Sequence, residues 1–193
     1  MTVQEVWTAE QYRAHFAETR ACLSVTDSVA PSPRRPSEYE EQVHFFALVD
    51  LLAKRHPSSA DDLLDVFSTS SGGKRDRATA GKLREAGQRA GIPDIEVLVP
   101  KHGCHGLVIE LKPLGSGKAS RAQRDRLDRL CARGYSAHLI HGWLAAGKVL
   151  CTYLSLPWPS DAEPAVELVI ALRIFQRKVA RKKRRRAVFA SSL

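Results

Sequence analysis

Residues 91–112, GIPDIEVLVPKHGCHGLVIELK, set three charged side chains at the ends of two short apolar runs. Asp94 stands at the head of the first run, and Glu110 and Lys112 end the second run two positions apart. Burying a charged group costs free energy unless a partner compensates the charge. A chain that buries these runs must therefore pair the three charges, and this requirement restricts the folds that are open to it.

The two runs are expected to form a β-hairpin. Pro93 cannot donate a hydrogen bond to a strand ladder, so it marks the start of a strand that we place at residues 95–99. The glycine-containing turn KHGCHG then leads into a second strand at residues 107–112. Side chains alternate between the two faces of a strand, and the hairpin folds one strand beside the other. We therefore expect Asp94 to lie near Glu110.

Two carboxylates at one point repel each other unless one is protonated or a divalent cation lies between them. Oxygen ligands favour Mg²⁺ or Mn²⁺. Lys112, on the same face as Glu110, can neutralise part of the charge or act on a phosphate. The alternative is a solvated strand face, because E-x-K is a common surface pair and P-D a common turn dipeptide. The spacing of 15 residues between Asp94 and Glu110, flanked by apolar runs, favours the site.

The rest of the chain predicts an α/β or α+β sandwich around a mixed sheet. Ser37 and Glu40 predict a capping box, and the helix that they open runs to about Arg55, before Pro57, with Phe45 on its apolar stripe. Ser120 predicts the start of another helix. The other expected elements are a short N-terminal helix within residues 1–25, strands at 63–69 and 137–140, and helices at 77–90, at 143–155 and from about 165 into the C-terminal tail.

The net charge of +9 is concentrated near the C-terminus. Nine Lys or Arg and no acid lie between Arg173 and Arg186, and the 21 other basic residues balance the 21 acidic ones. Such a run favours contact with a phosphate backbone, and a solvated tail is the alternative. The residues that we expect to bind nucleic acid are Lys74, Arg75, Arg77, Lys82, Arg84, Arg181, Lys182, Lys183, Arg184, Arg185 and Arg186.

Several other classes of protein are disfavoured. No apolar run approaches the roughly 18 to 20 residues of a membrane span, and the N-terminus lacks a signal-peptide pattern. The four scattered cysteines predict reduced thiols rather than a disulfide framework. We therefore expect a protein of the cytoplasm, or of the nucleus in a eukaryotic host. His102, Cys104 and His105 match no standard zinc spacing, so a hairpin turn is the favoured interpretation.

The order of these motifs resembles the VRR-NUC branch of the PD-(D/E)xK nucleases. The pattern is G-[IV]-P-D, an apolar strand, a second apolar strand ending in E-L-K, and S-x-x-Q at a helix start, and it spans about residues 37–156. The family also has a helix glutamate four residues before a glutamine, which matches Glu38 and Gln42; Glu41, on the same helix face, is a competing choice. The other residues that match the pattern are Gly91, Pro93, Asp94, Glu110, Lys112 and Gln123.

The resemblance implies a restriction-endonuclease-like core, in which helices flank a central mixed β-sheet. This nuclease domain would occupy residues 37–156. A helical extension and linker would precede it at residues 1–36, and a linker with a basic helix would follow at 157–193. Residues 1–30 and those after 164 lie outside the family pattern.

The resemblance also implies metal-dependent hydrolysis of nucleic-acid phosphodiesters. Asp94, Glu110 and the backbone carbonyl of Leu111 would hold Mg²⁺ or Mn²⁺, with Glu38 as an added ligand. Lys112 would orient the nucleophile or offset charge on the phosphate. Gln123 would position the phosphate or support the site, and it is also available to cap its helix with Ser120.

DNA, duplex or branched, is the expected substrate, while RNA and a homodimeric assembly are open. The alternative function is a catalytically inactive nucleic-acid-binding protein on a nuclease-like fold. The intact set of Asp94, Glu110 and Lys112 argues against it, since an inactive relic would be free to lose these residues.

Overall fold

The computed structural model of the protein describes residues 36–69 and 77–190. The helix predicted within residues 1–25 lies outside the described residues, as do Lys74 and Arg75. The side chains of residues 77–80 and 182–190 also lie outside the description, although their backbone is helical.

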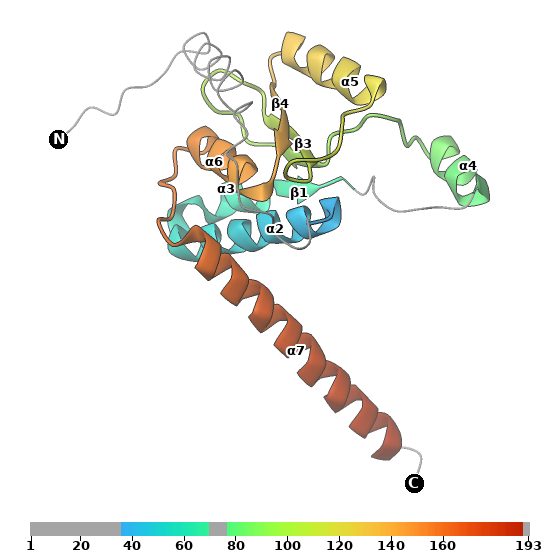
Figure 1. The fold of residues 1–193 in the computed structure, drawn as a ribbon, viewed down its shortest axis with the longest axis vertical. Helices are drawn as coiled ribbons and strands as arrows, with labels where there is room; N and C mark the ends of the chain where they lie inside the picture. Colours follow the sequence, from blue (N-terminus) through green and yellow to red (C-terminus); the bar gives the residue numbers. More distant parts are fainter. Residues whose placement is uncertain (1–35, 70–76, 191–193) are drawn as a thin grey trace, which may run out of the picture.

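Four strands form one mixed sheet in the order β1-β2-β3-β4 (Figure 1). The strands are β1 (Val66–Ser68), β2 (Ile95–Val97), β3 (Leu107–Lys112) and β4 (Ser136–His141). β2 pairs antiparallel with both β1 and β3, which confirms the predicted hairpin, whereas β4 runs parallel to β3. β3 is buried along its whole length. This central strand is therefore where the charges at positions 110 and 112 enter the interior.

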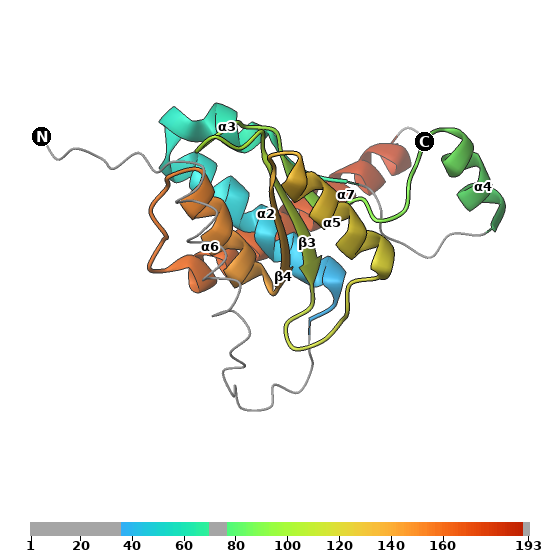
Figure 2. The same ribbon diagram turned by 90° about the horizontal axis from the view of Figure 1, so that it is seen from above.

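Helices cover both faces of the sheet (Figure 2). Ile109 and Leu111 lie in the core that α2 and α6 cover, and Gln123 of α5 contacts Glu110, which alternates with them on the opposite face. The bounds of these helices are Glu38–Arg55 for α2, Arg121–Ala132 for α5 and Trp143–Tyr153 for α6. The fold is thus α/β, with helices flanking a central mixed sheet, as the sequence predicts.

Local signals set the ends of α2. The Ser37 hydroxyl accepts the Glu40 N–H, and the Glu40 carboxylate accepts the Ser37 N–H, which completes the predicted capping box. The helix ends at Arg55, two residues before Pro57, because the residue before a proline disfavours helical backbone. Phe45 on the apolar stripe is fully buried in the core.

The prediction of a strand over residues 63–69 is only partly right. A 3₁₀ turn, η1 (Pro57–Ser59), leads directly into α3 (Ala60–Leu64), and β1 begins after it. Acidic residues in the first turn of α3 favour the helix. Leu63 is buried in the core while Leu64 is 79% exposed, as one short helical turn against α2 requires.

Three other predicted elements are shorter than expected, and one of them is α6, which ends at Tyr153 rather than at residue 155. β2 ends at Val97 because the next backbone groups find partners elsewhere: the Leu98 N–H donates to Asp65 and the Val99 carbonyl accepts the Tyr153 hydroxyl. α4 (Arg77–Glu85) ends soon before Gly87, whose φ of 98° a side chain would strain. Figure 1 shows that α4 stands apart from the sheet and its helices.

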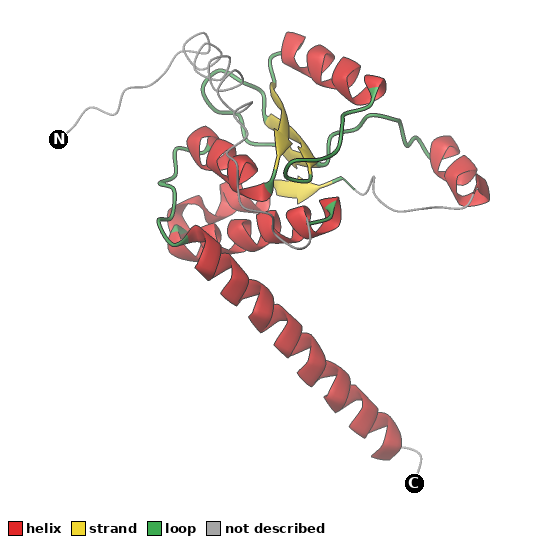
Figure 3. Ribbon diagram, in the orientation of Figure 1, coloured by secondary structure: helices red, strands yellow, loops and turns green. Residues whose placement is uncertain are grey.

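The C-terminal helix α7 (Ala162–Ala190) is one helix of 29 residues and starts three residues before its predicted position (Figure 3). Side-chain contacts dock α7 and the residue before it onto α2: Arg55 pairs with Asp161 at 2.6 Å, His44 lies 2.9 Å from the Glu167 carboxylate, and Arg173 pairs with Asp50. Beyond these contacts α7 extends away from the body of the molecule (Figure 1). None of the helices in residues 36–69 and 77–190 has both the length and the apolarity to cross a bilayer.

Candidate active site

The carboxyl groups of Asp94 and Glu110 lie together on one face of the hairpin. The register pairs Ile95 with Ile109, so that one step further along the ladder Asp94 stands opposite Glu110. Both side chains are buried, and Glu110 is 0% exposed. The Leu111 N–H donates to Asp94 Oδ2 at 2.9 Å, which ties the aspartate to the strand that carries the glutamate.

Backbone geometry fixes the approach to Asp94. Gly91 has a φ of 75°, and a Cβ at this position would lie 2.4 Å from the Ala122 carbonyl oxygen, so only glycine fits between the Pro93 turn and α5. At the end of β1, the Thr69 N–H donates to the Asp94 carbonyl at 3.0 Å and its hydroxyl donates to the Pro93 carbonyl. The Pro-Asp step is therefore held from both sides.

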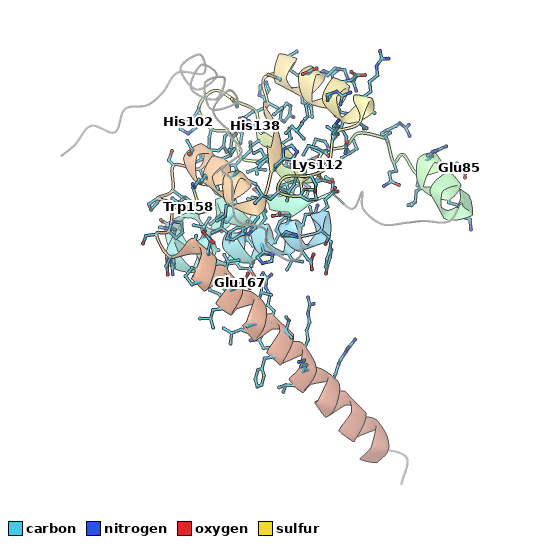
Figure 4. The ribbon with its side chains drawn as sticks, viewed as in Figure 1. Glu85, His102, Lys112, His138, Trp158 and Glu167 are labelled. Carbon is cyan, nitrogen blue, oxygen red and sulfur yellow. The ribbon has the colours of Figure 1, made fainter. Side chains whose placement is uncertain are left out.

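The Lys112 ammonium group lies between two carboxylates. Its Nζ is 2.6 Å from Glu110 Oε1 and 3.2 Å from Glu38 Oε2. The lysine is buried, whereas the Glu38 side chain is 45% exposed. In Figure 4 the label of Lys112 marks this point, where the end of the sheet meets α2. The ammonium group is a cation held among the acidic side chains of the site.

Gln123 serves the helix start and the site at once. Its Oε1 accepts the Ser120 N–H at 2.7 Å, and the Ser120 hydroxyl accepts the Gln123 N–H at 3.2 Å, which forms a capping box on α5. Its Nε2 donates to Glu110 Oε1, the oxygen that Lys112 also contacts. Gln123 and Lys112 therefore both bond to Oε1 of Glu110, and neither of them bonds to Oε2.

The two competing glutamates of α2 lie in different surroundings. The Glu38 carboxylate meets Lys112 at the site. Glu41 is 1% exposed, and its oxygens accept the backbone N–H groups of Leu114 and Trp143 at 3.1 and 2.8 Å. Glu38 is therefore the glutamate that faces the other charged groups, and Glu41 is bonded to the backbone.

The charged groups perturb each other's pKa values. Burial raises the pKa of Glu110 to about 7, and the nearby Asp94 carboxylate adds to the rise while Lys112 opposes it. Burial also raises the pKa of Asp94, against the hydrogen bond from Leu111 and the charge of Lys112. Burial acts to lower the pKa of Lys112, but its hydrogen bond to Glu110 and the surrounding carboxylates outweigh burial and raise it.

The raised pKa of Glu110 predicts that the metal-free protein loses stability as pH rises from about 4.5 to about 7. In this interval the folded state keeps a proton that the unfolded chain has released, so the free energy of unfolding falls with pH. The interval corresponds to about 3 kcal/mol for this group alone. Urea unfolding in EDTA at pH 5, 6, 7 and 8 measures the change.

Glu110→Gln is the comparison for this experiment, because the amide does not titrate. We expect its unfolding free energy to vary less with pH than that of the wild type, and to exceed the wild-type value at pH 8. Equal pH dependence in the two proteins would show that Glu110 is ionised normally in the folded state.

The donor set fits a divalent cation. Glu110 Oε2 is buried and has no hydrogen-bond partner among the described residues. Leaving a buried acceptor unsatisfied costs free energy, which a bound cation would recover. Mg²⁺ is commonly held by one or two carboxylates and keeps several waters, so Asp94 and Glu110 suffice as its protein carboxylates. Within the described ranges no three His, Cys, Asp or Glu side chains are grouped closely enough to hold a metal ion, so Glu38 does not complete a three-carboxylate set with Asp94 and Glu110 in the structure.

The KHGCHG turn has a structural role. The His102 ring contacts the Tyr153 carbonyl at 3.1 Å, and the Lys101 N–H donates to the Tyr153 hydroxyl at 3.2 Å. Cys104 is buried. These contacts fasten the β2–β3 connection to the end of α6, and they agree with the interpretation of this segment as a turn.

The loop of residues 113–118, beside the site, was not predicted to contact it. After β3 the chain turns back so that a Cβ on Gly117 would lie 3.4 Å from Lys112 Cδ, and His141 Nε2 contacts the Gly117 carbonyl at 3.1 Å. The only signal in PLGSGK is that of a flexible turn. Its contact with the lysine depends on β4, which lies far along the chain.

Those of the predicted nucleic-acid-binding residues that the structure describes lie on projecting helices rather than around the carboxylates. Lys82 and Arg84 are exposed on α4, and Arg181 is exposed on α7. Arg77 belongs to α4, and residues 182–186 belong to the projecting half of α7, by their backbone. In Figure 4, Glu85 at the end of α4 is set apart from Lys112. The role of these residues in binding nucleic acid stays a prediction.

Comparison with known proteins bears on the fold. No protein-family model matches the chain, and no curated protein matches it. Among solved structures, one described as "VRR_NUC domain protein" matches with a TM-score of 0.53 and 24% sequence identity. The match covers 64% of this chain and 92% of that chain. The likeness shows a VRR-NUC-like fold, which fits a restriction-endonuclease-like core.

Proposed function

We propose that the chain is a nuclease that hydrolyses phosphodiester bonds of DNA with bound Mg²⁺ or Mn²⁺. The observation that carries the proposal is the meeting of two buried carboxyl groups, Asp94 and Glu110, beside a buried ammonium group, with one carboxylate oxygen left unsatisfied among the described residues. The VRR-NUC-like fold supports the same class of activity.

Asp94, Glu110 and the Leu111 carbonyl would hold the cation, with Glu38 as an added ligand, directly or through water. When bound, the cation makes an attacking water more acidic and polarises the phosphate. Glu110 offers Oε2, because Gln123 and Lys112 both contact Oε1. Asp94 is held by the Leu111 N–H, so its carboxylate is oriented in advance.

Lys112 would stabilise negative charge on the phosphoryl oxygens or orient the attacking water. Its raised pKa keeps the side chain protonated at neutral pH, as charge stabilisation requires. Gln123 would support this arrangement through its hydrogen bond to Glu110.

A panel of labelled DNA substrates tests the proposal: duplex, single-stranded, flapped and four-way-junction DNA, each incubated with Mg²⁺, Mn²⁺ or EDTA. An RNA of the same sequence is included. We expect cleavage of at least one DNA with either metal and none in EDTA. Cleavage that EDTA leaves unchanged would contradict the metal dependence. Binding without cleavage of any substrate would favour the catalytically inactive alternative.

We also propose that the basic half of α7 adds sequence-independent DNA affinity. Truncation after Gln176 keeps Arg173, which bonds Asp50 and the Phe46 carbonyl, and removes eight basic residues. Each phosphate contact contributes about 0.9 to the salt dependence of log K. If half of the eight residues contact phosphates, the slope falls by roughly 3.6.

Fluorescence anisotropy across a salt series measures this slope, and turnover at saturating DNA is measured beside it. We expect weaker binding with nearly unchanged turnover. Equal affinity of the truncated and full-length proteins at every salt concentration would refute the role of the tail. A location in the cytoplasm, or in the nucleus of a eukaryotic host, stays an expectation. The assembly state is open between monomer and homodimer, and size-exclusion chromatography with light scattering distinguishes the two.

A further inference from the structure

We propose that Glu41 is a positioning residue, which fixes the first turn of α2 so that Glu38 meets Lys112. This inference rests on the proposed nuclease function, because Glu38 and Lys112 belong to the proposed site. Glu41 itself contacts backbone groups and acts through its neighbour one helical turn away.

Glu41 joins three segments of the chain. Its Oε1 accepts the Leu114 N–H at 3.1 Å and its Oε2 accepts the Trp143 N–H at 2.8 Å. Both carboxylate oxygens are therefore used, by donors from two different connections. The side chain is 1% exposed, so these bonds are shielded from water. Charge-assisted hydrogen bonds of this kind are stronger than those between neutral groups.

The two donors lie just beyond the paired ends of the central strands. Lys112 ends β3 and His141 ends β4, and the register pairs them. The Gly142 N–H donates to the Lys112 carbonyl at 2.9 Å, which continues the pairing. Leu114 lies two residues after Lys112, and Trp143 lies two residues after His141. Glu41 consequently fastens α2 to the sheet at the level of the lysine.

The start of α6 explains why a carboxylate is used here. Gly142 caps this helix with a φ of 83° and supplies no side-chain hydrogen bond. The first N–H groups of a helix need acceptors, and the positive end of the helix dipole favours an anion. The Glu41 carboxylate accepts the N–H of Trp143, the first residue of α6, and places a negative charge at this end of the helix. Burial of the carboxylate is thereby compensated, and α2 and α6 are held in register.

Glu38 needs such an anchor. Its side chain is 45% exposed, and it meets Lys112 at 3.2 Å. An ion pair to which one partner contributes an exposed, flexible side chain is weak when nothing holds that partner in place. Three helical residues span only about 4.5 Å along the axis, so the bonds of Glu41 fix the backbone that carries Glu38.

The first test does not depend on nuclease activity. Urea unfolding of the full chain gives the free energies of unfolding of Glu38→Ala, Lys112→Met and the double variant, and from them the coupling free energy between the two side chains. The cycle is measured once with Glu41 present and once in the Glu41→Gln background. We expect a favourable coupling free energy between Glu38 and Lys112 when Glu41 is present, and none when Glu41 is replaced by Gln. The same coupling in both backgrounds would overturn the proposal. If Glu41→Gln does not fold, Glu41→Asp, which keeps the charge and shortens the reach, replaces it.

The second test measures cleavage with Mg²⁺. We expect Glu41→Gln to lower kcat about tenfold with little change in KM, and to cause no further loss in the Glu38→Ala background. Equal fold-losses in both backgrounds would mean a merely structural role. Val49→Ala is the matched control, because it weakens core packing on α2 without touching the site. A wild type inactive with every metal would refute the nuclease function alone, and the unfolding test would still decide the role of Glu41.

Discussion

Lys112→Met is expected to reduce metal-dependent DNA cleavage by about 10²- to 10³-fold, the loss found when a group that stabilises transition-state charge is removed. Methionine keeps most of the apolar stem that packs beside Gly117 but removes the ammonium group. Without it, Glu110 and Glu38 lose their common cation. Glu110 then takes up a proton more readily, because the positive charge that opposes the rise of its pKa is gone.

The protonation of Glu110 keeps the variant folded, since a buried neutral carboxyl group costs far less free energy than a buried anion. Lys54→Met, at an exposed position of the same helix that carries Glu38, is the control and should cleave DNA like the wild type. Initial rates at saturating Mg²⁺, with circular dichroism to verify folding, make the comparison. Wild-type rates in Lys112→Met would remove the lysine from the mechanism.

Asp94→Asn is expected to lower cleavage by at least about 100-fold and also to weaken metal binding. The amide oxygen can still accept the Leu111 N–H, so the hairpin keeps its geometry. The negative charge is lost, and the cation keeps only Glu110 as a site carboxylate on the hairpin. Isothermal titration with Mn²⁺ and initial cleavage rates measure the two effects.

The same substitution should stabilise the metal-free protein at pH 8. Asp94 raises the pKa of Glu110 by repulsion, and this repulsion disappears with the charge. Lost activity together with increased stability distinguishes a functional carboxylate from a structural one. Asp128→Asn, at an exposed position of α5, is the control and should change neither quantity. A destabilised Asp94→Asn protein that still cleaves DNA would contradict both expectations.

The parts of the fold that sequence predicts well are those with local causes. The capping boxes at Ser37 and Ser120 and the hairpin around residues 95–112 each depend on residues close in the chain, and the structure confirms them. The alternation of side chains in β3 then brings Glu110 and Lys112 onto the face that Asp94 shares. For the same reason Gln123 could be assigned both a capping and a supporting contact.

What sequence could not decide depends on contacts between distant residues. Glu38 and Glu41 share a helix face, and their surroundings differ because Glu41 bonds to the backbone of Leu114 and Trp143, which lie 73 and 102 residues beyond it. Near the start of α7, Asp161 pairs with Arg55 of α2, which lies 106 residues earlier in the chain. Helical periodicity carries no information about either contact.

Anomalous diffraction from crystals grown with Mn²⁺ tests directly whether Asp94 and Glu110 share a divalent cation. We expect an anomalous peak bonded to Asp94 and to Glu110 Oε2, with Mg²⁺ at the same position in a matched crystal. An ordered site at millimolar Mn²⁺ with no peak between these carboxyl groups, and with Lys112 still bonded to Glu110, would contradict this expectation.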